Sequence, residues 1–106
     1  MSEQRSRLSL TLRAPDRPAV TRTLSCDPVG GDHPRAAEAC ATLAALDDPF
    51  APLPPGTIAT MIYGGPETVT IDGQWQGRPV HAEFNRTNGA EIHRWERLGP
   101  VLDLGD

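Results

Sequence analysis

The sequence predicts a single domain that combines one or two helices with antiparallel strands, the α+β class. Three observations lead to this prediction: an early stretch that alternates apolar and polar residues, an alanine-rich helical stretch, and a later stretch with the pattern of a hairpin. A chain of 106 residues is long enough for about one domain. We therefore treat residues 1–106 as one unit and expect residues 1–6 and 99–106 to be weakly ordered.

The first two elements expected are strands. Residues 7–13, RLSLTLR, place three leucines at alternate positions with polar residues between them, which is typical of a half-buried strand. Two prolines within residues 14–18 interrupt the pattern, and the alternation resumes over residues 19–26. Two antiparallel strands fit this arrangement best.

A helix is expected next, from about residue 34 to residue 46. Its proline suits the first helical position, which leaves Asp32 or His33 to cap the helix. The apolar residues of the segment recur at helical spacing and place Cys40 on the inward side. Cys40 should therefore face the strand that carries Cys26.

The cysteines Cys26 and Cys40 indicate a structural disulfide, because an even count in a short, loop-rich chain usually marks an oxidised bridge. The bridge would close a loop of about 15 residues, which the chain-entropy model values at about 3 kcal/mol. A zinc site that adds His33 is the alternative. The spacing is too wide for a zinc knuckle and no fourth ligand is evident, so no metal is expected.

Residues 47–56 contain four prolines, which argue against both a helix and a central strand. They lead into residues 57–63, TIATMIY, which favour an extended conformation but are followed at once by Gly-Gly-Pro. We expect this segment to be an exposed, extended loop. On its residue type alone, Met61 would more commonly be a buried strand residue.

The last elements expected are a hairpin over residues 68–84 and a short final strand. Asp72-Gly73 offers the positive φ angles of a tight turn. After the hairpin, a loop is expected around Asn88-Gly89, and the final strand follows it.

Composition and motifs exclude several classes of function. The formal net charge of −4 and the lack of a basic run argue against a nucleic-acid partner, and no apolar stretch is long enough for a membrane span. Hydrolase and phosphate-loop motifs are missing, which argues against an enzyme, and no cofactor is expected. Residues 1–5 lack the apolar stretch of a secretory signal, so cytosolic and secreted locations both stand, and the cysteine pair favours secretion.

Several segments resemble the Streptomyces subtilisin inhibitor family over about residues 8–92. The most specific parts are CDPVGGDHPRAAEACATLAAL and the hairpin TVTIDGQWQGRPV. The resemblance implies an antiparallel sheet of about five strands with helices on one face, paired into a homodimer through the sheet. It also implies a proteinaceous serine protease inhibitor that acts by the standard, substrate-like mechanism.

The resemblance also assigns a reactive site. The family presents its scissile bond on an exposed loop, commonly with Met or Lys on the acyl side, just before a β-branched residue and a tyrosine. It therefore implies that the reactive bond is Met61-Ile62 and that the partner is a subtilisin-like protease, with chymotrypsin-like enzymes as a second class. The loop would comprise Ile58, Ala59, Thr60, Met61, Ile62 and Tyr63.

One departure from the family concerns this loop. The family carries a second disulfide beside the reactive bond, and Ala59 and Ala90 stand at its positions here. Pro52, Pro54 and Pro55 before the loop, the hairpin behind it and the Cys26-Cys40 bridge beneath it would then have to keep the loop rigid. A second function stays open: an interaction module with the family's fold that lost tight inhibition together with that disulfide.

Overall fold

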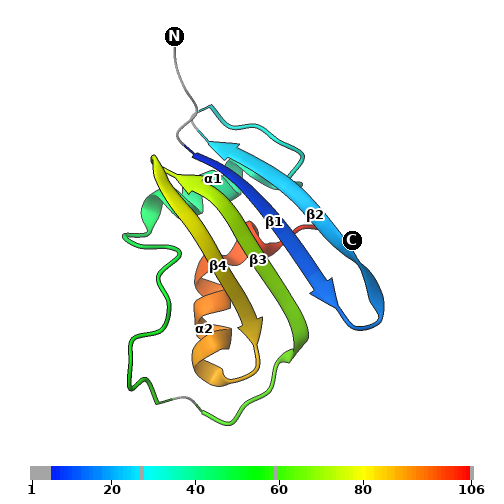
Figure 1. The fold of residues 1–106 in the computed structure, drawn as a ribbon, viewed down its shortest axis with the longest axis vertical. Coiled ribbons are helices and arrows are strands. Elements are labelled where there is room, and N and C mark those ends of the chain that lie inside the picture. Colours follow the sequence, from blue (N-terminus) through cyan, green and yellow to red (C-terminus); the bar gives the residue numbers. More distant parts are fainter. Residues whose placement is uncertain (1–5, 27, 59, 106) are drawn as a thin grey trace.

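The computed structural model describes residues 6–26, 28–58 and 60–105. These residues form one antiparallel sheet of four strands in the order β2-β1-β3-β4, with both helices on the same face (Figure 1). In chain order the elements are β1 (Ser6–Ala14), β2 (Arg17–Cys26), α1 (Ala36–Ala45), β3 (Gly65–Trp75), β4 (Arg78–Arg86), α2 (Gly89–Leu98) and the 3₁₀ helix η1 (Gly99–Leu102). The α+β prediction is confirmed, with four strands in place of about five.

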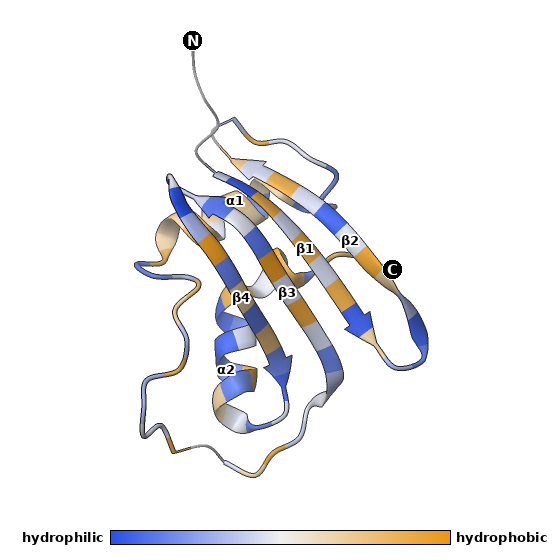
Figure 2. Ribbon diagram, viewed as in Figure 1, coloured by the Kyte–Doolittle hydropathy of each residue, from blue (hydrophilic) through white to orange (hydrophobic). Residues whose placement is uncertain are grey.

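The alternation of the first strand has the expected consequence. Leu8 and Leu10 are buried on the helix-covered face of β1, where Leu8 pairs with Leu24 of β2 and Leu10 pairs with Ile71 of β3. Figure 2 shows apolar and polar residues alternating along β1, β3 and β4. The core therefore lies between this face and the two helices. Its largest fully buried side chains include Phe84, Leu10, Leu24, Leu43 and Ile71.

The helix α1 begins at Ala36, two residues later than predicted, and the predicted capping role is wrong. Its N-cap residue is Arg35, which makes no side-chain capping hydrogen bond. Asp32 instead accepts hydrogen bonds from Thr23 of β2, at 2.6 Å from its backbone nitrogen and 3.1 Å from its hydroxyl. The backbone hydrogen bond is the main reason that the pKa of Asp32 lies below its usual value.

The disulfide prediction is confirmed. Cys26 and Cys40 are bonded, with their Cα atoms 5.7 Å apart, so the end of β2 is tied to α1. Their sulfurs are therefore not free to bind zinc. In the described part of the chain, no group of three or more His, Cys, Asp or Glu residues could hold a metal ion.

The C-terminal segment packs into the core, which corrects the expectation of a weakly ordered tail over residues 99–105. Three of its apolar side chains are buried: Val101, Leu102 and Leu104. The buried ring of His33 joins this segment to α1, because its Nε2 donates to the carbonyl of Val101 at 2.9 Å and its Nδ1 accepts from the backbone of Arg35 at 3.0 Å. At the other end of the chain, Ser6 is already part of β1, and residues 1–5 lie outside the described residues.

The hairpin prediction is right, but its turn was misplaced. The turn consists of Gln76 and Gly77, with φ angles of 52° and 82°, while Asp72-Gly73 lies inside β3. Two consecutive positive φ angles are typical of the two-residue turn that matches strand twist. Glutamine is an uncommon residue in this conformation, which is why the Asp-Gly pair was the stronger sequence signal.

The predicted final strand is wrong, because this segment forms the helix α2. Asn88 caps the helix with its side-chain oxygen, which accepts from the backbone of Glu91 at 2.9 Å. The inward-facing residues Arg94 and Leu98 are one turn apart, as helical spacing requires. In the described part of the chain, neither this helix nor any other is long and apolar enough to cross a membrane.

Candidate functional site

Most of the exposed large apolar side chains lie on the segment that joins α1 to β3. Apart from Val29, the exposed large apolar residues of the described chain all belong to it: Ile58 (95% exposed), Met61 (99%), Ile62 (57%) and Tyr63 (65%). Such a concentration of exposed apolar surface marks an interaction site. The predicted exposed loop is therefore confirmed, and the alternative that Met61 is a core strand residue is wrong.

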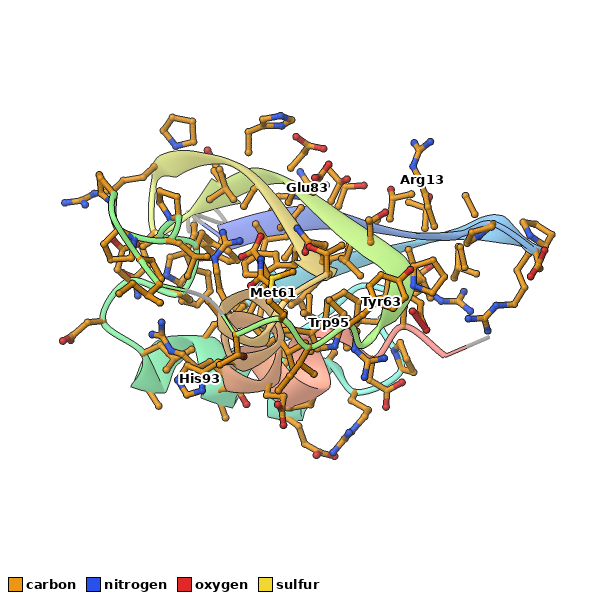
Figure 3. The ribbon with its side chains drawn as sticks, turned by 90° about the horizontal axis from the view of Figure 1, so that it is seen from below. Arg13, Met61, Tyr63, Glu83, His93 and Trp95 are labelled. Atoms are coloured by element: carbon orange, nitrogen blue, oxygen red, sulfur yellow. A yellow bond between two sulfur atoms is a disulfide. The ribbon has the colours of Figure 1, made fainter. Side chains whose placement is uncertain are left out.

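The loop lies at the end of the sheet opposite the disulfide. Figure 1 shows it descending beside β4 and entering β3 below the tip of β4, whereas the last residue of β2, Cys26, is at the other end. Figure 3 views the loop end, with Met61 and Tyr63 on the same side of the sheet as Trp95 of α2. The disulfide therefore does not lie beneath the loop, contrary to the expectation from the sequence.

A backbone hydrogen bond holds the acyl side of the loop. The N–H of Gly89, the first residue of α2, donates to the carbonyl of Thr60 at 3.1 Å. Further back, the carbonyl of Pro54 accepts from both the backbone N–H and the hydroxyl of Thr57, at 3.2 and 2.6 Å. These bonds restrain the loop immediately before Met61.

A second backbone hydrogen bond holds the amine side. The N–H of Gly64 donates to the carbonyl of Arg86, at the end of β4, over 2.7 Å. A Cβ added to Gly64 would lie only 2.9 Å from the Cδ1 of Ile92, so this side chain packs against the loop backbone. Residues 60–64 are therefore fastened at both ends to residues 86–89, the connection between β4 and α2.

The buried side chain of Arg94 fastens the start of the connector, which is the segment of residues 46–64 between α1 and β3. Its Nε donates to the carbonyl of Ala51 at 3.0 Å, and its Nη1 donates to the carbonyl of Glu83 at 2.9 Å. Its guanidinium carbon also lies 4.1 Å from the centre of the Phe84 ring, a cation–π contact. Because Glu83 belongs to the edge strand β4, Arg94 joins the connector to an otherwise open strand edge.

A partly buried carboxylate completes this network. Glu91 lies 3.5 Å from Arg94 through one oxygen, and its other oxygen accepts from the side-chain nitrogen of Asn85 at 2.8 Å. A buried guanidinium needs such a partner, because an unpaired charge in the interior is costly. The network therefore stabilises the junction of β4, α2 and the connector.

A large groove among the described residues lies away from the loop. It has a volume of about 1350 Å³ and is lined by α1, the start of the connector and the turn between β3 and β4. Phe50 and Trp75 meet there edge to face, with ring centroids 6.3 Å apart. Trp75 is thus a packing residue at the edge of the core.

The residues that support the loop were not predicted from the sequence: Gly64, Arg86, Gly89, Glu91 and Arg94. For the three that belong to α2, the cause is the strand predicted after Asn88. A capping asparagine followed three residues later by a glutamate is a helix-start signal, and it could have revealed α2. Of the two positions expected to carry the family's second disulfide, Ala90 is the second residue of α2, and Ala59 lies outside the described residues.

An exposed segment with anchored ends has a definite chemical use. It can add as a strand to the substrate cleft of a protease, where backbone hydrogen bonds supply affinity and alternate side chains fill pockets. Met61 is the most exposed of the large apolar residues described in the loop, and its side chain is long and unbranched. These properties suit a broad hydrophobic specificity pocket.

Comparison with known proteins agrees with this interpretation. The family model described as subtilisin inhibitor-like matches residues 4–88. Subtilisin inhibitor-like protein 1 of Streptomyces cacaoi is 38% identical over 86 residues, which cover 76% of this chain and 76% of that protein. The subtilisin inhibitor of Streptomyces albogriseolus is 40% identical over 88 residues, which cover 81% of this chain but only 59% of that protein.

The fold has a counterpart of known structure. The crystal structure of Streptomyces caespitosus sermetstatin in complex with Bacillus licheniformis subtilisin matches with a TM-score of 0.57 and 28% identity. The match covers 91% of this chain and 96% of that one. The family model and the two relatives cover most of this chain. The chain therefore belongs to the subtilisin inhibitor-like family.

Proposed function

We propose that the protein is a serine protease inhibitor that acts by the standard, substrate-like mechanism. Its reactive bond is Met61-Ile62, and its partner is a subtilisin-like protease, with chymotrypsin-like enzymes as a second class. One observation carries the proposal: Met61 is 99% exposed on a loop whose two sides are hydrogen-bonded to the connection between β4 and α2. Membership of a family with inhibitors among its members supports it.

The mechanism follows from the anchored loop. A bound protease attacks the carbonyl of Met61 to form an acyl-enzyme, and the new amine of Ile62 is the leaving group. The hydrogen bond between Gly64 and Arg86 holds that amine close to the acyl group, so religation competes with attack by water. Anchoring also reduces the entropy that the loop loses on binding, which strengthens the complex.

In this proposal the protease supplies every catalytic group. The inhibitor contributes only the bond that enters the cleft and the scaffold that holds it. The protein is then not itself an enzyme, and its action requires neither a cofactor nor a metal ion.

We further propose that the chain is secreted and forms a homodimer through the open face of its sheet. The disulfide supports secretion, because such bridges persist in oxidising compartments. Both helices lie on one face, which leaves the other face of the sheet available for pairing (Figure 1). Light scattering on the purified protein tests the dimer: a mass of one chain at micromolar concentration would contradict it.

Titration of an active-site-calibrated subtilisin tests the inhibitor proposal. We expect one equivalent of the protein to abolish activity, because the loop and the cleft bind one to one. The alternative is an interaction module that lost tight inhibition, and it predicts no stoichiometric loss. Activity that stays unchanged in excess protein would favour that alternative.

A day-long incubation with subtilisin tests how long inhibition lasts. The loop is held by hydrogen bonds and packing, so we expect slow cleavage at Met61-Ile62 and gradual recovery of activity. Ala59→Cys with Ala90→Cys should lengthen the inhibited phase if the new pair forms a disulfide. Mass spectrometry checks both outcomes, and an intact wild-type chain with lasting inhibition would show that the non-covalent contacts suffice.

A further inference from the structure

Thr60, the residue that precedes Met61, lies directly against Gly89, the first residue of α2. Beyond the hydrogen bond between their backbones, Thr60 occupies the space where a side chain of Gly89 would stand. A Cβ added to Gly89 would lie 1.8 Å from the Oγ1 of Thr60, 3.2 Å from its Cβ and 3.6 Å from its nitrogen. Rotation of the Thr60 side chain would relieve the first of these contacts, and the third is an ordinary van der Waals distance, but the second would remain too tight. Any residue other than glycine at position 89 would therefore both turn the Thr60 side chain and shift Thr60 by a few tenths of an ångström.

The local conformation does not explain why position 89 is glycine. Gly89 belongs to α2, and it is not one of the glycines with a positive φ angle. Alanine forms helix more readily than glycine, so glycine is the poorer choice on helix propensity alone. The close approach of Thr60 is the feature of the structure that requires it.

We propose that Gly89 is a positioning residue for the reactive bond. Its missing side chain lets Thr60 lie on the start of α2, and its N–H then fixes the carbonyl of Thr60. Because Met61 follows directly, the orientation of this peptide sets the direction in which Met61 leaves the loop. The inference rests on the proposed function, since it concerns how the same loop is held for the protease.

Gly89→Ala tests the proposal, because its effects on the loop and on the fold should have opposite signs. We expect inhibition of subtilisin to weaken about tenfold, since small misplacements of a reacting group are costly. Cleavage at Met61-Ile62 should become faster by a similar factor. The melting temperature should stay equal or rise, because alanine favours the helix. If Gly89 served only the stability of the fold, Gly89→Ala would lower the melting temperature.

Two variants of Thr60 in the Gly89→Ala background serve as a matched pair. Thr60→Ala removes the crowding Oγ1, so it should recover part of the lost inhibition. Thr60→Val replaces the hydroxyl with a methyl group of similar size, so it should not. Each double variant is compared with its own Thr60 variant, because Thr60 also contacts the protease in the proposed complex.

The outcomes separate this inference from the proposed function. If Gly89→Ala inhibits and is cleaved like the wild type, the positioning role is wrong. The role is also wrong if inhibition and melting temperature fall together and Thr60→Ala rescues neither. If the wild type does not inhibit subtilisin, the proposed function fails, and the cleavage rate still decides the inference: faster cleavage of Gly89→Ala supports it, and an unchanged rate overturns it.

Discussion

The two ends of the sheet are held together in different ways. At one end, the Cys26-Cys40 disulfide joins β2 to α1 covalently. At the other end, the exposed loop depends on backbone hydrogen bonds from Gly89 and Gly64 and on the buried guanidinium of Arg94. Among the described residues, the loop with the proposed activity is thus held without a disulfide, whereas the opposite end of the sheet has one.

This difference separates two physical tasks. A disulfide stabilises the folded state mainly by restricting the unfolded chain, wherever it is placed. A reactive loop needs restraint of a few particular atoms, which short hydrogen bonds beside the scissile bond provide. Stability and loop position should therefore respond to different substitutions.

Removal of the disulfide should have the largest effect on stability. With Cys26→Ser and Cys40→Ser, we expect the free energy of unfolding to fall by about 3 kcal/mol, because the cross-link closes a loop of about 15 residues. Urea unfolding measures the loss, with reduced wild type as the control. Inhibition should persist wherever the variant is folded, and its loss in folded protein would show that the two ends are coupled.

Met61→Lys should have the next largest effect, and it should act on specificity alone. Lysine suits the acidic specificity pocket of trypsin, so trypsin inhibition should strengthen about 100-fold, or ~2.7 kcal/mol. The melting temperature should not change, because the Met61 side chain is 99% exposed.

Ile58→Lys is the matched control for this substitution. It places the same charge on the same loop, where Ile58 is 95% exposed, but away from the reactive bond. We expect no gain of trypsin inhibition. An equal gain from both variants would mean that the reactive bond has been misplaced.

Arg94→Met should affect both stability and the loop. It removes hydrogen bonds from a charged donor to two backbone carbonyls and leaves Glu91 without its cation, at a cost of about 2 kcal/mol. Because the Ala51 carbonyl loses its anchor, subtilisin should cleave the loop faster. The exposed Arg97→Met, on the same helix, is the control and should change neither the urea midpoint nor the cleavage rate.

The smallest effect is expected at an ion pair on the open face of the sheet. The ring of His81 donates a hydrogen bond to the carboxylate of Asp72, which raises the pKa of His81 above its usual value, and both side chains are exposed. A raised pKa in the folded state stabilises the fold when histidine is charged. The contribution is therefore present below about pH 6.5 and is lost as the pH rises through the pKa of the folded state.

Asp72→Asn should return the pKa of His81 toward its usual value, which NMR titration of the ring measures. Glu83→Gln should lower it less, because Glu83 makes the smaller contribution. The stability difference between wild type and Asp72→Asn should be visible near about pH 5 and absent near about pH 8. A pKa that Asp72→Asn does not change would mean that the pair does not form in solution.

The sequence by itself determined the elements whose residues alternate or recur without interruption. The leucines of β1 and the helical spacing around Cys40 predicted a sheet, a helix and the bridge between them. The prolines before residue 57 and the glycines after residue 63 predicted an exposed loop, and the resemblance to known inhibitors placed Met61 on it. These features are local, so they can be read along the chain.

Only the tertiary structure decided how the loop is held. Thr60 and Gly89, like Ala51 and Arg94, are far apart in the sequence and meet because β4 and α2 return beside the connector. The segment that forms α2 was predicted as a strand, because a short apolar pattern does not reliably distinguish the period of a helix from that of a strand. The sequence also could not show that the guanidinium of Arg94 is buried. Its burial depends on hydrogen bonds to backbone carbonyl groups, which every residue has, so no residue type identifies them in advance.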